Sequence, residues 1–486
     1  MTQLRQELFF AVRWPFIARY FGQFCLVIAV LNLVTLAAAL LEGQFLIAVA
    51  YALIVLGLIA GGWLLTRIKV KGRMQMNEAM VLVVLVFLAV PLVTALPLTV
   101  SGIAFADALF ETISAATTTG LSTLGPVEQR PMTFAFARAW MQWYGGLGIV
   151  VFSLALIVRP GMSARRLSSP DLPDDLAGGT RAHARRVLLV YGLLTLGSFL
   201  FWVLLGGQPL SGLLYTLSAV STGGFAPTAG SFADLPGLRL AWLVTVATLA
   251  GALPLALYHR AGRRGWREFT QNLEVRALLA AALVIILAFG TNLWLRGMDL
   301  SAVLRHAPLM ALSAQTTSGF SSLDPGGLDA ASKAILILAM ATGGSVGSTA
   351  GGFKILRLLI LFGLFYRCLK TLSVPPDAVV DQRLDKRKVE AKEIQDALMI
   401  ILMFVGVVFF SWFMFLAYGY PALDALFEVV SATGTVGLSS GLTQAALPIP
   451  LKLTLCVDML LGRLEFVAWL VFFYHRTWFG RKRGSS

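Results

Sequence analysis

Apolar residues occur in long blocks along the chain, and several blocks are long enough to cross a lipid bilayer. Residues 21–41, 45–65 and 80–98 are the first three blocks, and a membrane-spanning helix needs about 20 apolar residues. A large soluble core would instead show shorter amphipathic periods separated by charged faces. The pattern predicts an all-α polytopic membrane protein.

A short motif occurs four times between the later blocks. It consists of Ser-Ala, four further residues, Gly, and then Leu or Phe, and the serine-to-glycine spacing is six residues in every copy. The copies begin at Ser114, Ser218, Ser313 and Ser431. The first and last copies also share an upstream pentapeptide, Asp-Ala-Leu-Phe-Glu. Four copies at matched places in the hydropathy profile predict an internal repeat.

Each copy has the same neighbours: a span, an apolar stretch of about 12 residues that is too short to cross, a polar loop and a second span. The expected spans are 80–98 with 133–158, 187–205 with 240–257, 275–295 with an interrupted 334–370, and 397–417 with 451–474. We therefore expect two N-terminal spans followed by four pseudo-symmetric span–pore-loop–span repeats around a central pore, ten spans in all. The expected boundaries are 1–76 for the N-terminal spans and 77–160, 161–262, 263–372 and 373–486 for the repeats.

The charged residues are few and their placement is regular. They make up 13% of the chain, the formal charge is +14, and Lys and Arg cluster in every second loop. The positive-inside rule places these loops, and both termini, in the cytoplasm and the four pore loops outside. The charge therefore favours a membrane and not a nucleic acid as partner. The three Cys and four His are dispersed, so we expect no metal cluster, no cofactor and no enzyme activity.

Four irregular loops at one membrane depth suggest a pore. Irregular backbone is tolerated there only when it is buried in protein or lines a water-filled path. The residues before each motif glycine are mostly Thr, Ser and Gly, whose oxygens can replace the water around a monovalent cation, as carbonyl rings do in potassium filters. The motif glycines also permit the positive φ that turns a carbonyl inward. Helix packing through small residues is the alternative, and it explains one such segment better than four.

Two acidic residues, Glu111 and Glu428, lie three residues before the motif serine in the first and last copies. Together with Asp107 and Asp424 they have two interpretations. They cap the short pore helices, whose N-termini favour acids, or they form a negative outer vestibule that concentrates cations.

The second span of the third repeat is interrupted by a glycine-rich segment. Residues 343–352 contain five glycines, and each costs about 1 kcal/mol relative to Ala within a helix. A phosphate-binding loop is excluded because no Gly-Lys-Ser/Thr ending is present. We interpret the segment as a flexible gate below the filter, and a kink with packing glycines is the alternative.

The last span carries Asp458, Arg463 and Glu465 within an apolar stretch. Ionisable groups in a span usually face the bundle interior or a water-filled path. Arg463 either lines the pore as a positive barrier or forms an internal ion pair with Asp458, Glu465 or an acid on another span.

Taken together, these segments resemble the Trk/Ktr/HKT superfamily of potassium uptake proteins, and most closely its bacterial Trk-type membrane subunit. The resemblance rests on the four pore loops, on Gln-Trp-Tyr-Gly-Gly-Leu-Gly-Ile at 142–149, on Gly-Ser-Thr-Ala-Gly-Gly-Phe-Lys at 347–354, and on Met-Leu-Leu-Gly-Arg-Leu-Glu at 459–465. The two additional N-terminal spans are similar to the Trk branch. The resemblance implies potassium uptake across the bacterial inner membrane through a gated pore with a selectivity filter.

The resemblance also implies roles for particular residues. The potassium-binding filter would consist of Thr118, Thr119, Gly120, Thr222, Gly223, Gly224, Thr317, Ser318, Gly319, Thr435, Val436 and Gly437. The gate would consist of Gly343, Gly344, Gly347, Gly351, Gly352, Lys354 and Arg463.

The implied partners are a second copy of the chain, forming a homodimer, and a cytosolic ring of nucleotide-binding regulatory subunits (TrkA-like), for which the basic loops offer docking surfaces. Potassium is the implied substrate. A sodium-permeable or proton-coupled symporter on the same scaffold is the main alternative, and a polytopic membrane enzyme is a more distant one. The glycine-rich loops at Gly223-Gly224 and Gly434 favour sodium entry.

Overall fold

The computed structural model describes residues 11–72, 74–157, 179–373, 375, 383–385 and 387–479, with side chains from 153 to 183 left aside. The described part is helical apart from one antiparallel pair of two-residue strands, β1 (Arg383–Leu384) and β2 (Arg387–Lys388). The described residues also form three short 3₁₀ turns, at Val127–Gln129, Ser231–Asp234 and Pro325–Gly327.

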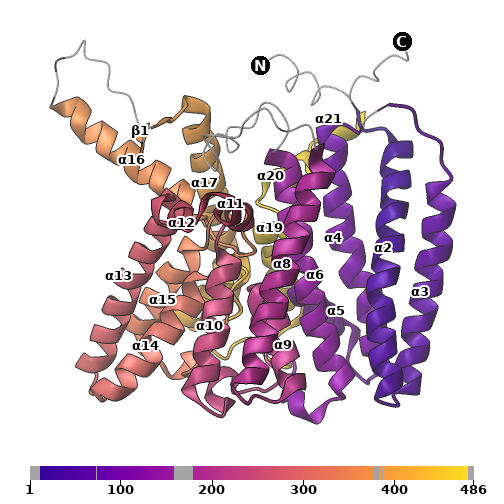
Figure 1. Ribbon diagram of the computed structural model, residues 1–486, viewed down its shortest axis with the longest axis horizontal. Coiled ribbons are helices and arrows are strands. Elements are labelled where there is room, and N and C mark those ends of the chain that lie inside the picture. Colours follow the sequence, from indigo (N-terminus) through magenta and orange to yellow (C-terminus); the bar gives the residue numbers. More distant parts are fainter. Residues whose placement is uncertain are drawn as a thin grey trace.

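The first two helices form a hairpin at one edge of the molecule, drawn in indigo in Figure 1. Helix α2 spans Trp14–Leu41 and α3 spans Phe45–Thr66. They approach closely where Gly22 faces Gly62, because a Cβ on either glycine would lie 2.8 Å from the carbonyl oxygen of the other. Many of their Leu, Val and Phe side chains remain exposed, as expected of helices that face lipid.

The rest of the described chain is built from four repeats with the predicted order of a long helix, a short pore helix, an irregular loop and a second helix. Repeat 1 contains α4 (Met76–Thr99), α5 (Phe105–Ala116) and α6 (Met132–Ile157). Repeat 2 contains α8 (Gly179–Leu204), α9 (Pro209–Val220), α10 (Leu238–Ala252), α11 (Leu255–Arg264) and α12 (Arg267–Gln271). Repeat 3 contains α13 (Leu273–Leu295), α14 (Leu300–Gln315), α15 (Ala330–Thr342) and α16 (Ile355–Leu372). Repeat 4 contains α17 (Ala391–Ala417), α18 (Ala422–Thr433), α19 (Ile449–Arg463), α20 (Val467–Phe473) and α21 (His475–Phe479).

The pore helices are α5, α9, α14 and α18. Three of them are 12 residues long and α14 has 16, which is about 18 to 24 Å and too short to cross a bilayer. In Figure 1 α5, α9 and α14 lie in the lower half, whereas the arginine-rich α11 and the short α12 that follows it lie in the upper half. Basic segments and pore loops are therefore on opposite sides, as the charge pattern predicts.

Within the described residues, six helices are long and apolar enough to cross a membrane individually: α2, α3, α4, α8 from Ala184, α13 and α17. The expectation of continuous spans at 240–257 and 451–474 is wrong. Helix α10 ends at Ala252 and turns by 90° into α11. Helix α19 ends at Arg463, and Glu465 and Phe466 adopt left-handed φ values of 57° and 61° before α20 begins.

The break after α10 has a local and a tertiary cause. Pro254 has no N–H to continue the helix. The carbonyls that a continuing helix would use instead accept hydrogen bonds from the glycine-rich segment of repeat 3: Ser345 N–H donates to Ala252 O at 3.0 Å and Thr349 N–H donates to Gly251 O at 3.1 Å. The helix end is therefore satisfied by protein and not by water.

The largest buried cluster surrounds the pore helices. Phe110 and Phe427 occupy the same position in α5 and α18, ten residues before the motif glycine, and both are wholly buried. Leu214 and Leu309 hold the equivalent positions in α9 and α14 and are almost as buried. This packing fixes the ends of the pore helices, from which the loops start.

Candidate functional site

The four pore loops, defined here as residues 117–121, 221–225, 316–320 and 434–438, share one backbone conformation. The motif glycines have positive φ values of 95°, 76°, 70° and 97°, as the sequence predicts. The second residue of each loop is a threonine that also has a positive φ, between 51° and 56°, at Thr118, Thr222, Thr317 and Thr435. Residues other than glycine rarely adopt this conformation because it costs about 1–2 kcal/mol. The strain recurs at four equivalent places, which is typical of a functional site.

The motif serine explains the six-residue spacing. In every repeat its carbonyl accepts a hydrogen bond from the N–H of the third loop residue, at 2.8 to 3.0 Å. In two repeats its hydroxyl reaches one residue further: Ser114 Oγ accepts from Gly120 N–H at 3.0 Å, and Ser431 Oγ accepts from Gly437 N–H at 3.1 Å. The end of the pore helix therefore holds the loop in its extended, strained form.

The four loops form a closed ring. A Cβ built on each motif glycine would clash with the third-residue carbonyl oxygen of the next loop, and the last loop meets the first. The pairs are Gly120 with Gly223, Gly224 with Ser318, Gly319 with Val436, and Gly437 with Thr119. Only glycine fits at these four places, because any side chain would push two neighbouring loops apart. The loops therefore surround one axis.

An outer vestibule opens onto this ring. Its volume is about 610 Å³, and all four motif glycines line it, together with residues of the polar loops that follow. The vestibule is the entrance that a path along the axis requires.

The glycine-rich segment at 343–354, hereafter the intramembrane loop, lies directly against the other end of the ring. Gly351 N–H donates to Thr317 Oγ1 at 2.8 Å, and the Thr349 and Thr222 hydroxyls are 3.4 Å apart. A Cβ on Gly351 would clash with Gly434 O. The intramembrane loop thus contacts pore loops 2, 3 and 4.

A small cavity of about 20 Å³ remains beside the intramembrane loop, with Lys354, Arg463 and Glu465 in its lining. This is room for roughly one water molecule. Arg463 Nη1 donates to Thr349 O at 2.7 Å, and Lys354 Nζ donates to Ala350 O. Both cations of the predicted gate therefore donate hydrogen bonds to carbonyls of the intramembrane loop.

A family model for cation transport proteins, TrkH, matches residues 46–478 of the chain. The chain belongs to the TrkH family. It is 29% identical to the Trk system potassium uptake protein TrkI of Halomonas elongata, over 96% of this chain and 97% of that protein. It is also 26% identical to an uncharacterized cation transporter of Methanocaldococcus jannaschii, over 85% of each chain. The fold matches the crystal structure of the potassium transporter TrkH from Vibrio parahaemolyticus with a TM-score of 0.85, at 23% identity, over 96% of this chain and 100% of that one.

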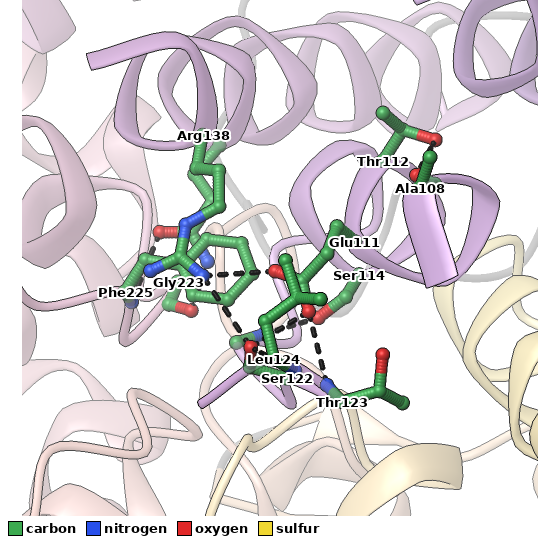
Figure 2. Close-up of polar contacts among 12 residues, drawn as sticks. Ala108, Glu111, Thr112, Ser114, Ser122, Thr123, Leu124, Arg138, Gly223 and Phe225 are labelled. Carbon is green, nitrogen blue, oxygen red and sulfur yellow. Dashed lines mark hydrogen bonds and ion pairs between the residues drawn. The ribbon is translucent and has the colours of Figure 1, made fainter. Parts of the chain in front are cut away.

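In this TrkH family member, Asp107 and Asp424 lie in the first turns of α5 and α18, as expected of acids at a helix N-terminus, but neither interpretation is correct for Glu111 and Glu428. Both are wholly buried in mid-helix, and the N-cap positions are Ala104 and Pro421. Each carboxylate instead accepts hydrogen bonds from the segment that follows its pore loop. Ser122 Oγ donates to Glu111 at 2.6 Å, as Figure 2 shows. Glu111 and Glu428 therefore stabilise the pore loops through hydrogen bonds and do not place negative charge in the vestibule.

The two carboxylates differ in their partners. Arg138 of α6 forms a 2.8 Å ion pair with Glu111 and stacks on the ring of Phe225 at 3.9 Å, so it links pore helix α5 to pore loop 2 (Figure 2). Glu428 instead accepts from hydroxyls and backbone N–H groups, including Ser440 N–H at 2.9 Å and Thr443 Oγ1 at 2.8 Å. Sequence reasoning missed Arg138, although a lone arginine inside an apolar span was a signal.

The ionisable groups of the last repeat have separate partners in the described part of the chain. Glu465 pairs with Arg357 of α16, and Asp458 accepts from Ser411 Oγ of α17 at 2.7 Å. Neither is the partner of Arg463, whose Nε and Nη2 make no hydrogen bond to described residues. Among the described residues Arg463 thus forms no ion pair with Asp458 or Glu465, and its place in the lining of a pore stays a prediction.

Proposed function

We propose that this TrkH family member is the translocating subunit of a Trk-type system and takes up potassium across the bacterial inner membrane. The observation that carries the proposal is the closed ring of four pore loops below a vestibule. A dehydrated cation needs oxygens on all sides, and a ring of four equivalent strands supplies them. The relative from Halomonas elongata is named for potassium uptake, which supports potassium as the substrate.

Two buried hydroxyl groups with no hydrogen-bond partner in the described chain are consistent with a cation bound on the axis. Thr118 Oγ1 and Thr435 Oγ1 are buried and make no hydrogen bond to described residues. Buried polar atoms usually have a partner. A potassium ion at the inner end of the ring would provide one, together with carbonyls of the predicted filter residues in all four loops.

The intramembrane loop is proposed as the gate. Its tight contact with pore loops 2, 3 and 4 corresponds to a closed state. Opening requires that the loop move away from the ring, which its glycines permit. The proposed assembly is a homodimer on a cytosolic ring of nucleotide-binding subunits, which would supply the signal for this movement.

The test is cation flux into liposomes that contain the purified protein, with potassium, rubidium, sodium and lithium compared. A Gly319→Ser variant introduces a side chain where Gly319 faces Val436 O. Gly406→Ser is the matched control, because a Cβ at Gly406 of α17 meets nothing within 4 Å. We expect potassium and rubidium to pass in preference to sodium and lithium, and only Gly319→Ser to lose this preference. Equal passage of all four cations by the unaltered protein would favour the sodium-permeable alternative, and no passage at all would contradict the pore.

A further inference from the structure

The side chain of Gln142 in α6 forms two hydrogen bonds to the backbone of pore loop 2. This side chain is wholly buried. Its amide nitrogen donates to Gly223 O, and its amide oxygen accepts from Phe225 N–H at 3.2 Å. The two hydrogen bonds flank the motif glycine Gly224, so one side chain holds the backbone on both sides of the residue that lines the axis.

The orientation of the amide is set by its partners. A carbonyl oxygen needs a donor and a backbone N–H needs an acceptor, so only one of the two amide orientations satisfies both Gly223 and Phe225. Among the third-residue carbonyls of the four loops, Gly223 O alone accepts from a side chain of the described chain. Pore loop 2 is therefore held in a way that the other three loops are not.

Gln142 occupies the space that a side chain at Gly223 would need. A Cβ on Gly223 would lie 2.6 Å from the amide oxygen and 2.8 Å from the amide nitrogen of Gln142. Pore loops 1 and 3 have side chains of their own at this third position. Thr119 Oγ1 contacts Thr117 Oγ1 at 2.8 Å, and Ser318 Oγ contacts Ser313 Oγ at 3.3 Å.

The repeats show that this arrangement is particular to repeat 1. Gly145, Gly251 and Gly462 each pack on the last pore-helix carbonyl of their own repeat, at Ala116, Val220 and Thr433, so they mark equivalent positions. The residues three places earlier are Gln142, Thr248 and Met459. Thr248 also reaches the next loop, with its hydroxyl 3.5 Å from Thr316 Oγ1. Of the three, Gln142 alone has an amide that can replace a missing loop side chain.

We propose that Gln142 is a positioning residue for ion selectivity. It supplies from α6 the anchoring that Gly223 cannot supply itself, and it thereby keeps the Gly223-Gly224 pair rigid enough to discriminate against sodium. This inference rests on the filter proposed above. It also changes the expectation from the sequence that the paired glycines favour sodium entry, since the second residue of the pair is held from both sides.

The experiment is the ratio of potassium to sodium flux in liposomes for the full chain and five variants. Gln142→Met introduces the residue found at the equivalent place of repeat 4 and removes both hydrogen bonds with little change in volume. A double-mutant cycle is completed by Gln142→Ala, Gly223→Ser and the double variant Gln142→Ala/Gly223→Ser. Met459→Leu is the control for substitution at the same helical position, and the thermal midpoint of each purified variant reports folding.

We expect Gln142→Met and Gln142→Ala to lower the flux ratio by roughly five- to twenty-fivefold, because each of the two lost hydrogen bonds changes an equilibrium by a factor of about five. Gly223→Ser alone should also lower the ratio, because serine collides with Gln142. The double variant should recover part of the ratio, since serine then has both space and the anchoring that Ser318 provides in pore loop 3. Met459→Leu should keep the ratio.

Three outcomes are decisive. An unchanged ratio in a folded Gln142→Met protein would overturn the inference, and so would a double variant no better than Gln142→Ala. A full chain that itself fails to discriminate potassium from sodium would instead reject the proposed filter, and the inference with it. The unaltered protein thus separates failure of the function from failure of the positioning role.

Discussion

Lys452 Nζ lies 2.5 Å from Asp107 Oδ1, and this ion pair joins the last repeat to the first across 345 positions of the chain. An equivalent ion pair joins repeat 3 to repeat 4, where Lys333 Nζ lies 2.7 Å from Asp424 Oδ1. Each lysine is in the first turn of a second helix, α19 or α15, and each aspartate is in the first turn of a pore helix. Ion pairs at these helix ends therefore join repeat 3 to repeat 4 and repeat 4 to repeat 1.

We expect Lys452→Met to destabilise the protein. The side chains of Lys452 and Asp107 are only 5% and 14% exposed, and removal of one partner from a buried pair costs about 3–5 kcal/mol. The thermal midpoint of the purified protein should fall clearly. Arg296→Met is the control, because the Arg296 side chain is 63% exposed beside Asp329 and such pairs contribute about 0–1 kcal/mol. Similar midpoints for the two variants would contradict a buried, structural pair.

Glu111→Gln should impair the protein more than Glu428→Gln. The first substitution leaves the buried guanidinium of Arg138 without its counter-charge, which costs several kcal/mol. At Glu428 a glutamine oxygen can still accept from Ser440 N–H, and its NH₂ group can donate to the Thr443 hydroxyl, which can rotate. Thermal midpoints and potassium flux of the two variants measure the difference. Equal losses would show that the Arg138 pair is not what distinguishes the two repeats.

Arg463→Ala should increase potassium flux through the purified protein in the absence of the proposed cytosolic ring. The substitution removes the hydrogen bond to Thr349 O that holds the intramembrane loop against the ring. One such bond lost shifts the balance toward the open state by roughly fivefold. Rubidium uptake into liposomes measures this effect, and Arg463→Lys, which retains the charge, should give a smaller increase. Reduced uptake in a folded Arg463→Ala protein would contradict a holding role.

Glu42, at the turn between α2 and α3, should make the attachment of this hairpin depend on pH. Burial raises the pKa of its carboxyl, but hydrogen bonds from the Thr133 hydroxyl and from the backbone N–H groups of Thr133 and Met132 outweigh this, so the pKa lies below its usual value. A lowered folded-state pKa stabilises the protein above the unfolded value of about 4.3 and ceases to do so as the pH falls through the folded value.

The thermal midpoint of the unaltered protein should therefore fall more steeply below about pH 4 than that of Glu42→Gln, which cannot titrate. At neutral pH the Glu42→Gln protein should be the less stable of the two. Parallel midpoint curves over this range would show that Glu42 does not contribute to the attachment.

The sequence by itself determined the architecture of this protein. A bilayer requires about 20 apolar residues per helix, so the long blocks, the shorter stretches before each Ser-Ala motif and the break at 343–354 were all visible as patterns along the chain. The positive φ of the motif glycines was predictable because only glycine adopts it freely. These properties depend on local composition and spacing.

The tertiary structure alone decided how distant segments support one another. The bend after Ala252 depends on hydrogen-bond donors from the intramembrane loop. Glu111 supports its pore loop, and does not act as a cap or a vestibule charge, because it pairs with Arg138. Gly223 O accepts a hydrogen bond from Gln142, which lies 81 positions away in the chain. Pro254 marks the break after Ala252 and the apolar surroundings of Arg138 mark that residue, but no sequence pattern near these residues identifies their partners. A hydrogen bond or ion pair between segments far apart is set by the packing of the helices that carry them, so it becomes visible only when the four repeats close around their axis.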